Sequence, residues 1–315
     1  MKIIASITLL ISIILISFSC SKEKRSDRKG PKMQEFIIEI SNFARKQNPN
    51  FIVIPQNGIE LAFNDLAEED GLNQELINAI DGFGIEELFY NTTVISNNEI
   101  LGMVQKVNEV KTIMVADFAG SNANYNDAIQ QCQNNGFICF PRKEGNYDYI
   151  DIPSTLINEN TDNITKLSDA KNYLYLISDS EFSSKTAYLD ALRATNYDVL
   201  LIDAFYEGEQ LTLAEVNSLK VKDNGGSRLV IAYMNIGAAE KYRYYWKDKW
   251  KVHSPGWLKK KYDGYDDEIW VKYWKKEWKE IIYSDSNSYT QRILNSGFNG
   301  VYLDNVEAYY FLYFD

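Results

Sequence analysis

Acidic and amide side chains stand at the carboxyl ends of several predicted strands. Short apolar runs end on or beside Gln56-Asn57, Glu86, Asp117, Asp203 and Asp304-Asn305. In an α/β barrel the carboxyl ends of the strands build the active site, so carboxylates from different strands would meet in one cleft. Glycoside hydrolysis requires such a pair, one as acid/base and the other as nucleophile or water activator. One strand-end Asp alone is more often a helix cap, and it is the five positions together that favour a site.

The rest of the sequence argues against several other kinds of catalytic and binding site. His253 is the only histidine, which disfavours a Ser-His-Asp triad, a His-rich metal site and a metal-dependent deacetylase. No Gly-x-Gly-x-x-Gly turn follows a strand, so nothing supports a dinucleotide site. We therefore expect no metal and no cofactor. With 33 Lys and Arg against 44 Asp and Glu, the net charge of −11 also makes nucleic acid a poor partner.

Eight short apolar runs alternate with helical patterns along the 315 residues. They lie at 51–54, 82–86, 112–117, 137–140, 173–177, 198–203, 228–233 and 300–304. Short buried runs separated by helices are typical of a parallel sheet covered by helices. Eight such units predict an α/β fold, a (β/α)8 TIM barrel, as a single domain over 33–315. An open doubly wound sheet with the same alternation is the alternative.

The first residues predict export. Met1-Lys2 is followed by an apolar or small stretch to Ser19, which is short for a bilayer span of about 20 residues. The small residues around Cys20 resemble a bacterial lipoprotein signal, in which this cysteine carries the lipid. We expect a signal peptide over 1–20, a tether over 21–32, and a lipoprotein anchored to the membrane through Cys20, periplasmic or at the cell surface. An ordinary secretory signal and an uncleaved anchor are the alternatives.

The aromatic and cysteine residues allow two further expectations. All six Trp lie between Trp246 and Trp278, and the last three recur every four residues, which predicts a helical stripe packed on the core. Trp246, in the irregular stretch before them, is a candidate for stacking against a sugar, as are Trp250 and Trp257. An oxidising compartment permits a disulfide between Cys132 and Cys139, but their places in a helical and a strand pattern favour buried free thiols.

Four blocks of sequence, at 50–58, 80–90, 231–246 and 297–307, carry a resemblance to a known family. They include Gly84-Ile85-Glu86-Glu87 and Leu303-Asp304-Asn305-Val306-Glu307. Together they resemble the endo-α-1,4-polygalactosaminidases, glycoside hydrolase family 114, over nearly all of 31–315. The resemblance implies a (β/α)8 barrel that hydrolyses α-1,4-linked galactosamine polymers. It also implies that Asp304 and Glu86 are the catalytic pair, as nucleophile and acid/base of a retaining reaction.

The order of these blocks departs from the family. There the segment similar to 170–315 comes first and the segment similar to 31–150 follows, so we expect a circularly permuted barrel. A closed barrel tolerates this, because its first and last strands are neighbours. The strands at 51–54 and 300–304 should then lie side by side. The expected substrate-binding residues are Asp203, Asp117, Asn57, Tyr233, Asn305, Glu307, Glu240 and Trp246.

The expected function is thus that of an exported, monomeric glycosidase acting on an amino-sugar polysaccharide. The acidic net charge suits a polycationic glycan. A non-catalytic glycan-binding lipoprotein on the same barrel is the alternative, because a fold alone does not decide function. A binding protein need not hold two carboxyls across one sugar, whereas a glycosidase must.

Overall fold

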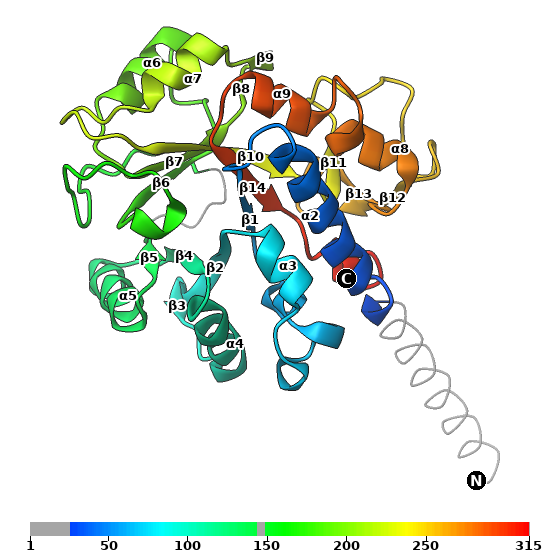
Figure 1. The fold of residues 1–315 in the computed structure, drawn as a ribbon, viewed down its shortest axis with the longest axis horizontal. Helices are drawn as coiled ribbons and strands as arrows, with labels where there is room; N and C mark the ends of the chain where they lie inside the picture. Colours follow the sequence, from blue (N-terminus) through cyan, green and yellow to red (C-terminus); the bar gives the residue numbers. More distant parts are fainter. Residues whose placement is uncertain (1–25, 144–148, 315) are drawn as a thin grey trace, which may run out of the picture.

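The computed structural model describes residues 26–143 and 149–314 (Figure 1). The predicted signal peptide and Cys20 lie outside these residues. Helix α2 (Gly30–Arg45) begins inside the segment expected to be a tether. Within the described ranges, none of the helices combines the length and the apolar character that a membrane span needs.

All eight predicted runs form strands, and these strands are parallel. Five of them make one sheet, in the order β1 (Ile52–Pro55), β14 (Gly300–Asp304), β10 (Leu229–Asn235), β7 (Val199–Asp203) and β6 (Tyr173–Leu176). The other three, β2 (Gly82–Asn91), β4 (Thr112–Phe118) and β5 (Ile138–Cys139), make a second sheet whose far edge is the short antiparallel β3 (Thr93–Val94). A bridge between Gln56 and Gly84 joins β1 to β2.

The first and last of these strands are neighbours, as predicted. Ile52 lies opposite Gly300 and Pro55 opposite Leu303. The strands therefore keep chain order around the two sheets, and the last strand, β14, lies beside the first, β1. Between β5 and β6 no ladder is formed within the described residues, so closure of the barrel is not shown. Aromatic side chains pack there instead, with the rings of Phe140 and Tyr173 5.5 Å apart.

Helices cover the outer faces of the strands (Figure 1). Besides α2 they are α3 (Gln74–Ala79), α4 (Asn98–Asn108), α5 (Asn122–Asn135), α6 (Lys185–Arg193), α7 (Leu213–Leu219), α8 (Lys276–Lys279), α9 (Tyr289–Asn295) and α10 (Ala308–Phe311). Most begin at a polar side chain that accepts a backbone N–H of the first turn; Thr212 and Glu215 form a reciprocal capping box on α7. The helix α2 buries Phe36, Ile37 and Ile40, which repeat at helical spacing.

A small antiparallel sheet is inserted between β10 and α8. It consists of β11 (Ala238–Glu240), β13 (Tyr265–Val271) and β12 (Leu258–Tyr262), in that order, and a two-stranded ribbon, β8 (Phe205–Tyr206) with β9 (Glu209–Gln210), follows β7. The predicted helical stripe of Trp is wrong: Trp270 lies in β13, Trp274 in a turn and Trp278 in α8. The last three residues of β13, Ile269 to Val271, are all buried, so Trp270 lies in the core without being part of a helical stripe.

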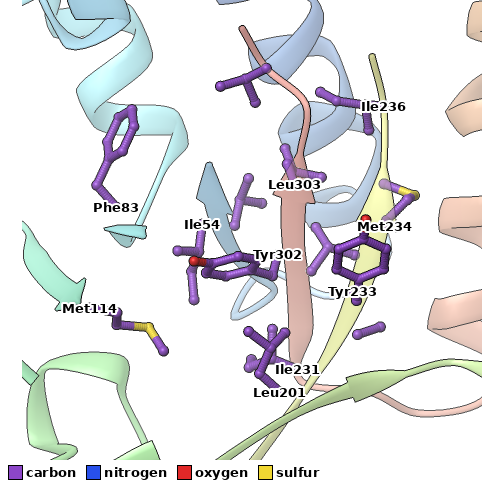
Figure 2. Packing of buried hydrophobic residues seen from close by; sticks show 14 of the residues in the cluster. Ile54, Phe83, Met114, Leu201, Ile231, Tyr233, Met234, Ile236, Tyr302 and Leu303 are labelled. Carbon is purple, nitrogen blue, oxygen red and sulfur yellow. The ribbon is translucent and has the colours of Figure 1, made fainter. Parts of the chain in front are cut away.

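The core lies between the strands and continues under the helices. Figure 2 shows the ring of Tyr302 beside Ile54, pointing away from Tyr233 and toward the side of Phe83 and Met114. Gly84 makes room for this ring, because a Cβ there would lie 1.9 Å from the Tyr302 hydroxyl oxygen. Both described cysteines are free thiols; Cys132 is buried, as expected, whereas Cys139 is only half-buried.

At the amino ends of the strands, a buried ion pair fixes the connection that precedes β6. Asp198 and Lys222 are both inaccessible to solvent, with 2.7 Å between Oδ1 and Nζ. The other oxygen of Asp198 accepts hydrogen bonds from Asn160 and from the backbone N–H of Lys171. Asp198 and Lys222 precede strands β7 and β10, and Asp198 also binds the connection before β6. The ion pair therefore ties this connection to the amino ends of the strands.

Candidate active site

A cavity of about 1070 Å³ opens at the carboxyl ends of the parallel strands. Seven of the ten residues predicted to act on or bind substrate line it: Asn57, Glu86, Asp203, Tyr233, Asp304, Asn305 and Glu307. The other three, Asp117, Glu240 and Trp246, are not among its lining residues. The cavity therefore brings the two proposed catalytic carboxylates together, from strands that are distant in sequence.

Glu86 is held at an irregularity of β2. The pairing of β2 with β4 is interrupted after Glu86, and Glu87 has a positive φ of 55°. The side-chain oxygen of Asn57 accepts the backbone N–H of Glu86 at 2.9 Å, and the Tyr149 hydroxyl donates to the Glu86 carboxylate. Burial, and next the nearby Asp304 carboxylate, raise the pKa of Glu86 to about 7. Glu86 is thus poised to exchange a proton near neutral pH.

Asp304 ends β14 and is held by two donors. The Tyr233 hydroxyl donates to Oδ2 at 2.5 Å, and the backbone N–H of Asn305 donates to Oδ1 at 2.7 Å. Burial raises the pKa of Asp304 to about 6, and these two hydrogen bonds oppose that rise by favouring the carboxylate. Because this pKa is below that of Glu86, the pair favours an ionised Asp304 beside a protonated Glu86 between the two values.

Glu307 is a third carboxyl in the same cavity. Burial, followed by the charges of Glu60, Asp304 and Glu86, raises the pKa of Glu307 to about 8, while a hydrogen bond with Asn57 opposes the rise. Tyr309, two residues on, donates to Glu60. Asn57 therefore contacts both the backbone of Glu86 and the side chain of Glu307, so its amide helps to position these two carboxyls.

Arg243 forms one wall of the cavity and was not singled out from the sequence. Its guanidinium binds Asp203 with both terminal nitrogens, at 2.8 and 2.7 Å, and its Nε lies 2.8 Å from Glu240. Glu240 is fully buried behind this wall and also accepts from the Tyr242 hydroxyl. Asp203 is therefore neutralised by an ion pair. In the sequence, the only indication of a structural role for Arg243 was its spacing of three residues from Glu240.

Asp117 lies in the sheet and not in the cavity, contrary to expectation. It is 1% exposed, and its Oδ1 accepts the backbone N–H groups of Phe89 and Tyr90 at 3.0 and 3.4 Å. The N–H groups of Phe89 and Tyr90 can bind Asp117 because the pairing of β2 with β4 is interrupted there. The irregularity that positions Glu86 therefore also turns Asp117 inward. Its burial raises the pKa of Asp117 to about 6.

Trp246 does not face the cavity either. Its ring packs edge-on against Trp250 at 5.5 Å, and Trp250 packs in the same way against Trp257. The aromatic faces available to a sugar come mainly from tyrosines. The aromatic residues that line the cavity are Tyr149, Tyr175, Phe205, Tyr233, Tyr242, Tyr244, Tyr262, Tyr265 and Phe311.

The cavity is strongly acidic. Its lining carboxylates are Glu60, Glu86, Glu87, Asp179, Asp203, Glu207, Asp267, Glu268, Asp304 and Glu307, and Arg243 is the one basic residue among the described residues that line it. Among the parts of the chain that the structure describes, no group of three or more His, Cys, Asp or Glu could hold a metal ion. The arrangement can transfer protons and attract cations.

Comparison with known proteins agrees with this chemistry. Residues 158–312 match the model of glycoside-hydrolase family GH114. An uncharacterized protein of Methanocaldococcus jannaschii is 35% identical over 152 residues, which cover 48% of this chain and 41% of the relative. Uncharacterized proteins of Thermotoga maritima and Deinococcus radiodurans are each 33% identical, over 118 and 122 residues, 38% of this chain and 35% and 37% of theirs.

The chain thus spans about two fifths or less of the length of these curated relatives. Asp304, Glu307, Asp203 and Arg243 lie inside the matched residues, whereas Asn57 and Glu86 lie outside them. The part of the chain that carries Asp304 is therefore similar to glycoside hydrolase family 114.

Proposed function

We propose that the protein is a glycoside hydrolase in which Asp304 and Glu86 are the catalytic pair. The observation that carries this proposal is a cavity with two carboxyls whose pKa values are raised to about 6 and about 7, each bound by a tyrosine hydroxyl. Pairs of carboxyls with separated pKa values are how glycosidases divide the roles of nucleophile and acid. The family match over Asp304 supports the same activity.

The reaction we propose retains the anomeric configuration. The ionised Asp304, oriented by Tyr233 and Asn305, attacks the anomeric carbon, while Glu86 gives its proton to the departing glycosidic oxygen. Glu86 is then a carboxylate that the Tyr149 hydroxyl stabilises. It takes a proton from a water molecule, which cleaves the ester between Asp304 and the sugar and restores both groups.

The substrate we propose is an α-1,4-linked galactosamine polymer that is at least partly deacetylated. Ten acidic side chains line the cavity against one arginine, and those that are ionised attract a polycation and disfavour an anionic glycan. The resemblance to the polygalactosaminidases supplies the linkage and the sugar. Such a chain also offers pyranose rings to the tyrosines of the cavity.

The test is incubation of purified protein with galactosaminogalactan, chitosan and chitin, followed by measurement of new reducing ends. We expect reducing ends from the galactosamine polymer, none from chitin, and none from a folded Asp304→Asn variant. Binding of the polymer without cleavage would favour the glycan-binding alternative. Equal activity of the Asp304→Asn variant would refute the assignment of the nucleophile.

We further propose that the barrel is circularly permuted relative to the family. The pairing of β1 with β14 and the restriction of the match to 158–312 support this, because a colinear alignment cannot join blocks whose order is exchanged. Rearranging the sequence as 158–315 followed by 31–150 provides a test. The family match should then extend into 50–90, and a match that still ends at 312 would contradict the permutation.

Export and anchoring through Cys20 are also proposals. Their support is the apolar stretch before Cys20 and the polar, basic residues after it. Labelling of expressing cells with a radioactive fatty acid should mark the parent protein and not a Cys20→Ala variant. Label in both proteins would place the lipid elsewhere, and absence of label from the parent would refute the anchor.

A further inference from the structure

We infer that the β12–β13 hairpin forms a separate subsite for a cationic amino-sugar residue, in which the Tyr265 ring stacks on the sugar and the Asp267 carboxylate binds its ammonium group. This inference rests on the proposed function, because it places a second residue of the same polymer beside the residue that is cleaved. It concerns residues outside the catalytic pair.

The size of the cavity leaves room for such a subsite. Pockets for ligands of drug size are roughly 300–1,000 Å³, and this cavity, of about 1070 Å³, reaches the upper end of that range. Its lining includes Asp179, which follows β6, and Glu207, which follows β8, as well as Tyr265 and Asp267 of the hairpin. A single sugar at Asp304 would leave most of this surface without contact.

The hairpin is fixed to the catalytic segment through Tyr262. Its hydroxyl donates to Asn305 Oδ1 at 3.1 Å, and its ring stacks on Trp270, with centroids 4.3 Å apart. Tyr265 packs edge-on against Tyr262 at 5.3 Å. The contacts therefore run from Asp304 to its neighbour Asn305, then to Tyr262, and then to Tyr265, which places Tyr265 one side chain further out along a braced wall.

Tyr265 and Asp267 can act on the same ligand. Side chains two residues apart in a strand point to the same face, and both of these line the cavity. Tyr265 is 37% exposed, Asp267 is exposed, and none of the ion pairs found within the described residues involves Asp267. The backbone oxygen of Asp267 accepts the N–H of Lys241 at 2.9 Å, which fixes this part of the strand.

The chemistry of these two groups selects a protonated amino sugar over a neutral one. The face of a tyrosine attracts both the C–H face of a pyranose and a nearby ammonium group. A carboxylate without a partner gains a charge-assisted hydrogen bond from that ammonium. An N-acetylated sugar could still stack on Tyr265 but would lose the charge interaction with Asp267.

Calorimetric titration tests the subsite, using α-1,4-galactosamine pentasaccharide, its fully N-acetylated form and monomeric galactosamine. We expect Tyr265→Ala to weaken pentasaccharide binding about 3- to 10-fold and Tyr265→Phe to retain it, since the ring and not the hydroxyl stacks. Asp267→Asn should weaken binding about 3- to 10-fold at low salt and less at high salt. Asp263→Asn, at the exposed turn of the same hairpin and outside the cavity lining, is the matched control.

Neither cavity variant should alter binding of the monomer or lose more affinity for the N-acetylated chain than for the cationic one. Unchanged pentasaccharide affinity in both variants would overturn the subsite, as would a parent protein that binds no galactosamine oligosaccharide. Measuring reducing ends in parallel separates the two proposals. If binding depends on Tyr265 but the polymer is not cleaved, the subsite is supported and the hydrolase activity is refuted. If the polymer is cleaved but the variants keep the affinity and KM of the parent, the hydrolase activity is supported and the subsite is refuted.

Discussion

Replacing Glu86 by Gln tests the proposed acid/base directly, because it removes the exchangeable proton and keeps the shape of the side chain. Asn57 holds Glu86 by its backbone N–H, which the substitution leaves in place. The Tyr149 hydroxyl can donate to an amide oxygen as it does to the carboxylate. The loss of activity should therefore reflect lost proton transfer, with the protein still folded.

The size and pH dependence of that loss follow from the site. Proton transfer by a positioned group contributes about 10²–10⁴ in rate, or about 2.7–5.5 kcal/mol of activation free energy. In the parent, Asp304 must be ionised and Glu86 protonated, with pKa values of about 6 and about 7. Treated as separate titrations, they leave about 60% of the enzyme productive at pH 6.5 and about 3% at pH 8.5, roughly a 20-fold fall. The variant should lose this alkaline limb.

The assay compares the polymer with a 2,4-dinitrophenyl α-galactosaminide, whose leaving group departs without protonation. We expect the Glu86→Gln variant to release a burst of about one dinitrophenolate per enzyme at a rate within roughly tenfold of the parent, followed by slow turnover, because water attack still needs the base. The Asp304→Asn variant should give no burst. The Glu109→Gln variant, at the exposed end of α4, serves as control. Full activity of Glu86→Gln on the polymer, or an unchanged alkaline limb, would refute the assignment.

Three further predictions concern stability. Replacing Asp198 by Asn strands the charge of buried Lys222 and should cost about 3–5 kcal/mol, measured by urea unfolding; a loss below about 1 kcal/mol would contradict the role of the pair. The pKa of Glu307 is raised to about 8, so the folded state binds its proton more tightly and stability falls as pH rises from about 4.5 to 8. The Glu307→Gln variant should therefore gain up to about 4 kcal/mol at pH 8 and little at pH 4, and an equal gain at both pH values would refute the linkage. The Gly84→Ala change drives a methyl group into the buried Tyr302 and should cost about 1–3 kcal/mol or more, read from thermal unfolding, where an unchanged midpoint would count against this packing.

The strands could be predicted because each buries a short run on both faces. The run Val199 to Ile202 is wholly buried, as is Val301 to Leu303, and so both read as apolar without alternation. Closure of the barrel could not be predicted in the same way. The strand β5 has only two residues, and aromatic packing around Phe140 stands where a ladder with β6 would be.

That Glu86 and Asp304 lie in one cavity could be predicted, but the environment of the other strand-end acids could not. Asp117 and Asp203 occupy equivalent positions in the sequence, each as an acid at the end of an apolar run. Asp117 turns inward because backbone N–H groups of β2 that are not paired with β4 donate to it. Asp203 is neutralised because it forms an ion pair with Arg243, which lies 40 residues further along the chain. Both outcomes depend on which segments of the chain are neighbours in the fold, and the type of residue at the end of a strand does not indicate this.

The proposed reaction and the stability of the protein make opposite demands on the same carboxyls. Burial raises the pKa of Glu86, Asp304 and Glu307 above their ordinary values, so each ionisation near neutral pH opposes folding. The same burial keeps a proton on Glu86 at the pH where Asp304 has lost its own, which a solvated pair would not do. At the opposite end of the strands Asp198 and Lys222 are paired without access to solvent, so that end holds no unpaired charge of this pair. A bound polycation would act at the site itself, since ammonium groups beside these carboxyls favour their ionised forms. The acidic cavity therefore fits a substrate whose charge offsets the electrostatic cost of ionising these buried carboxyls.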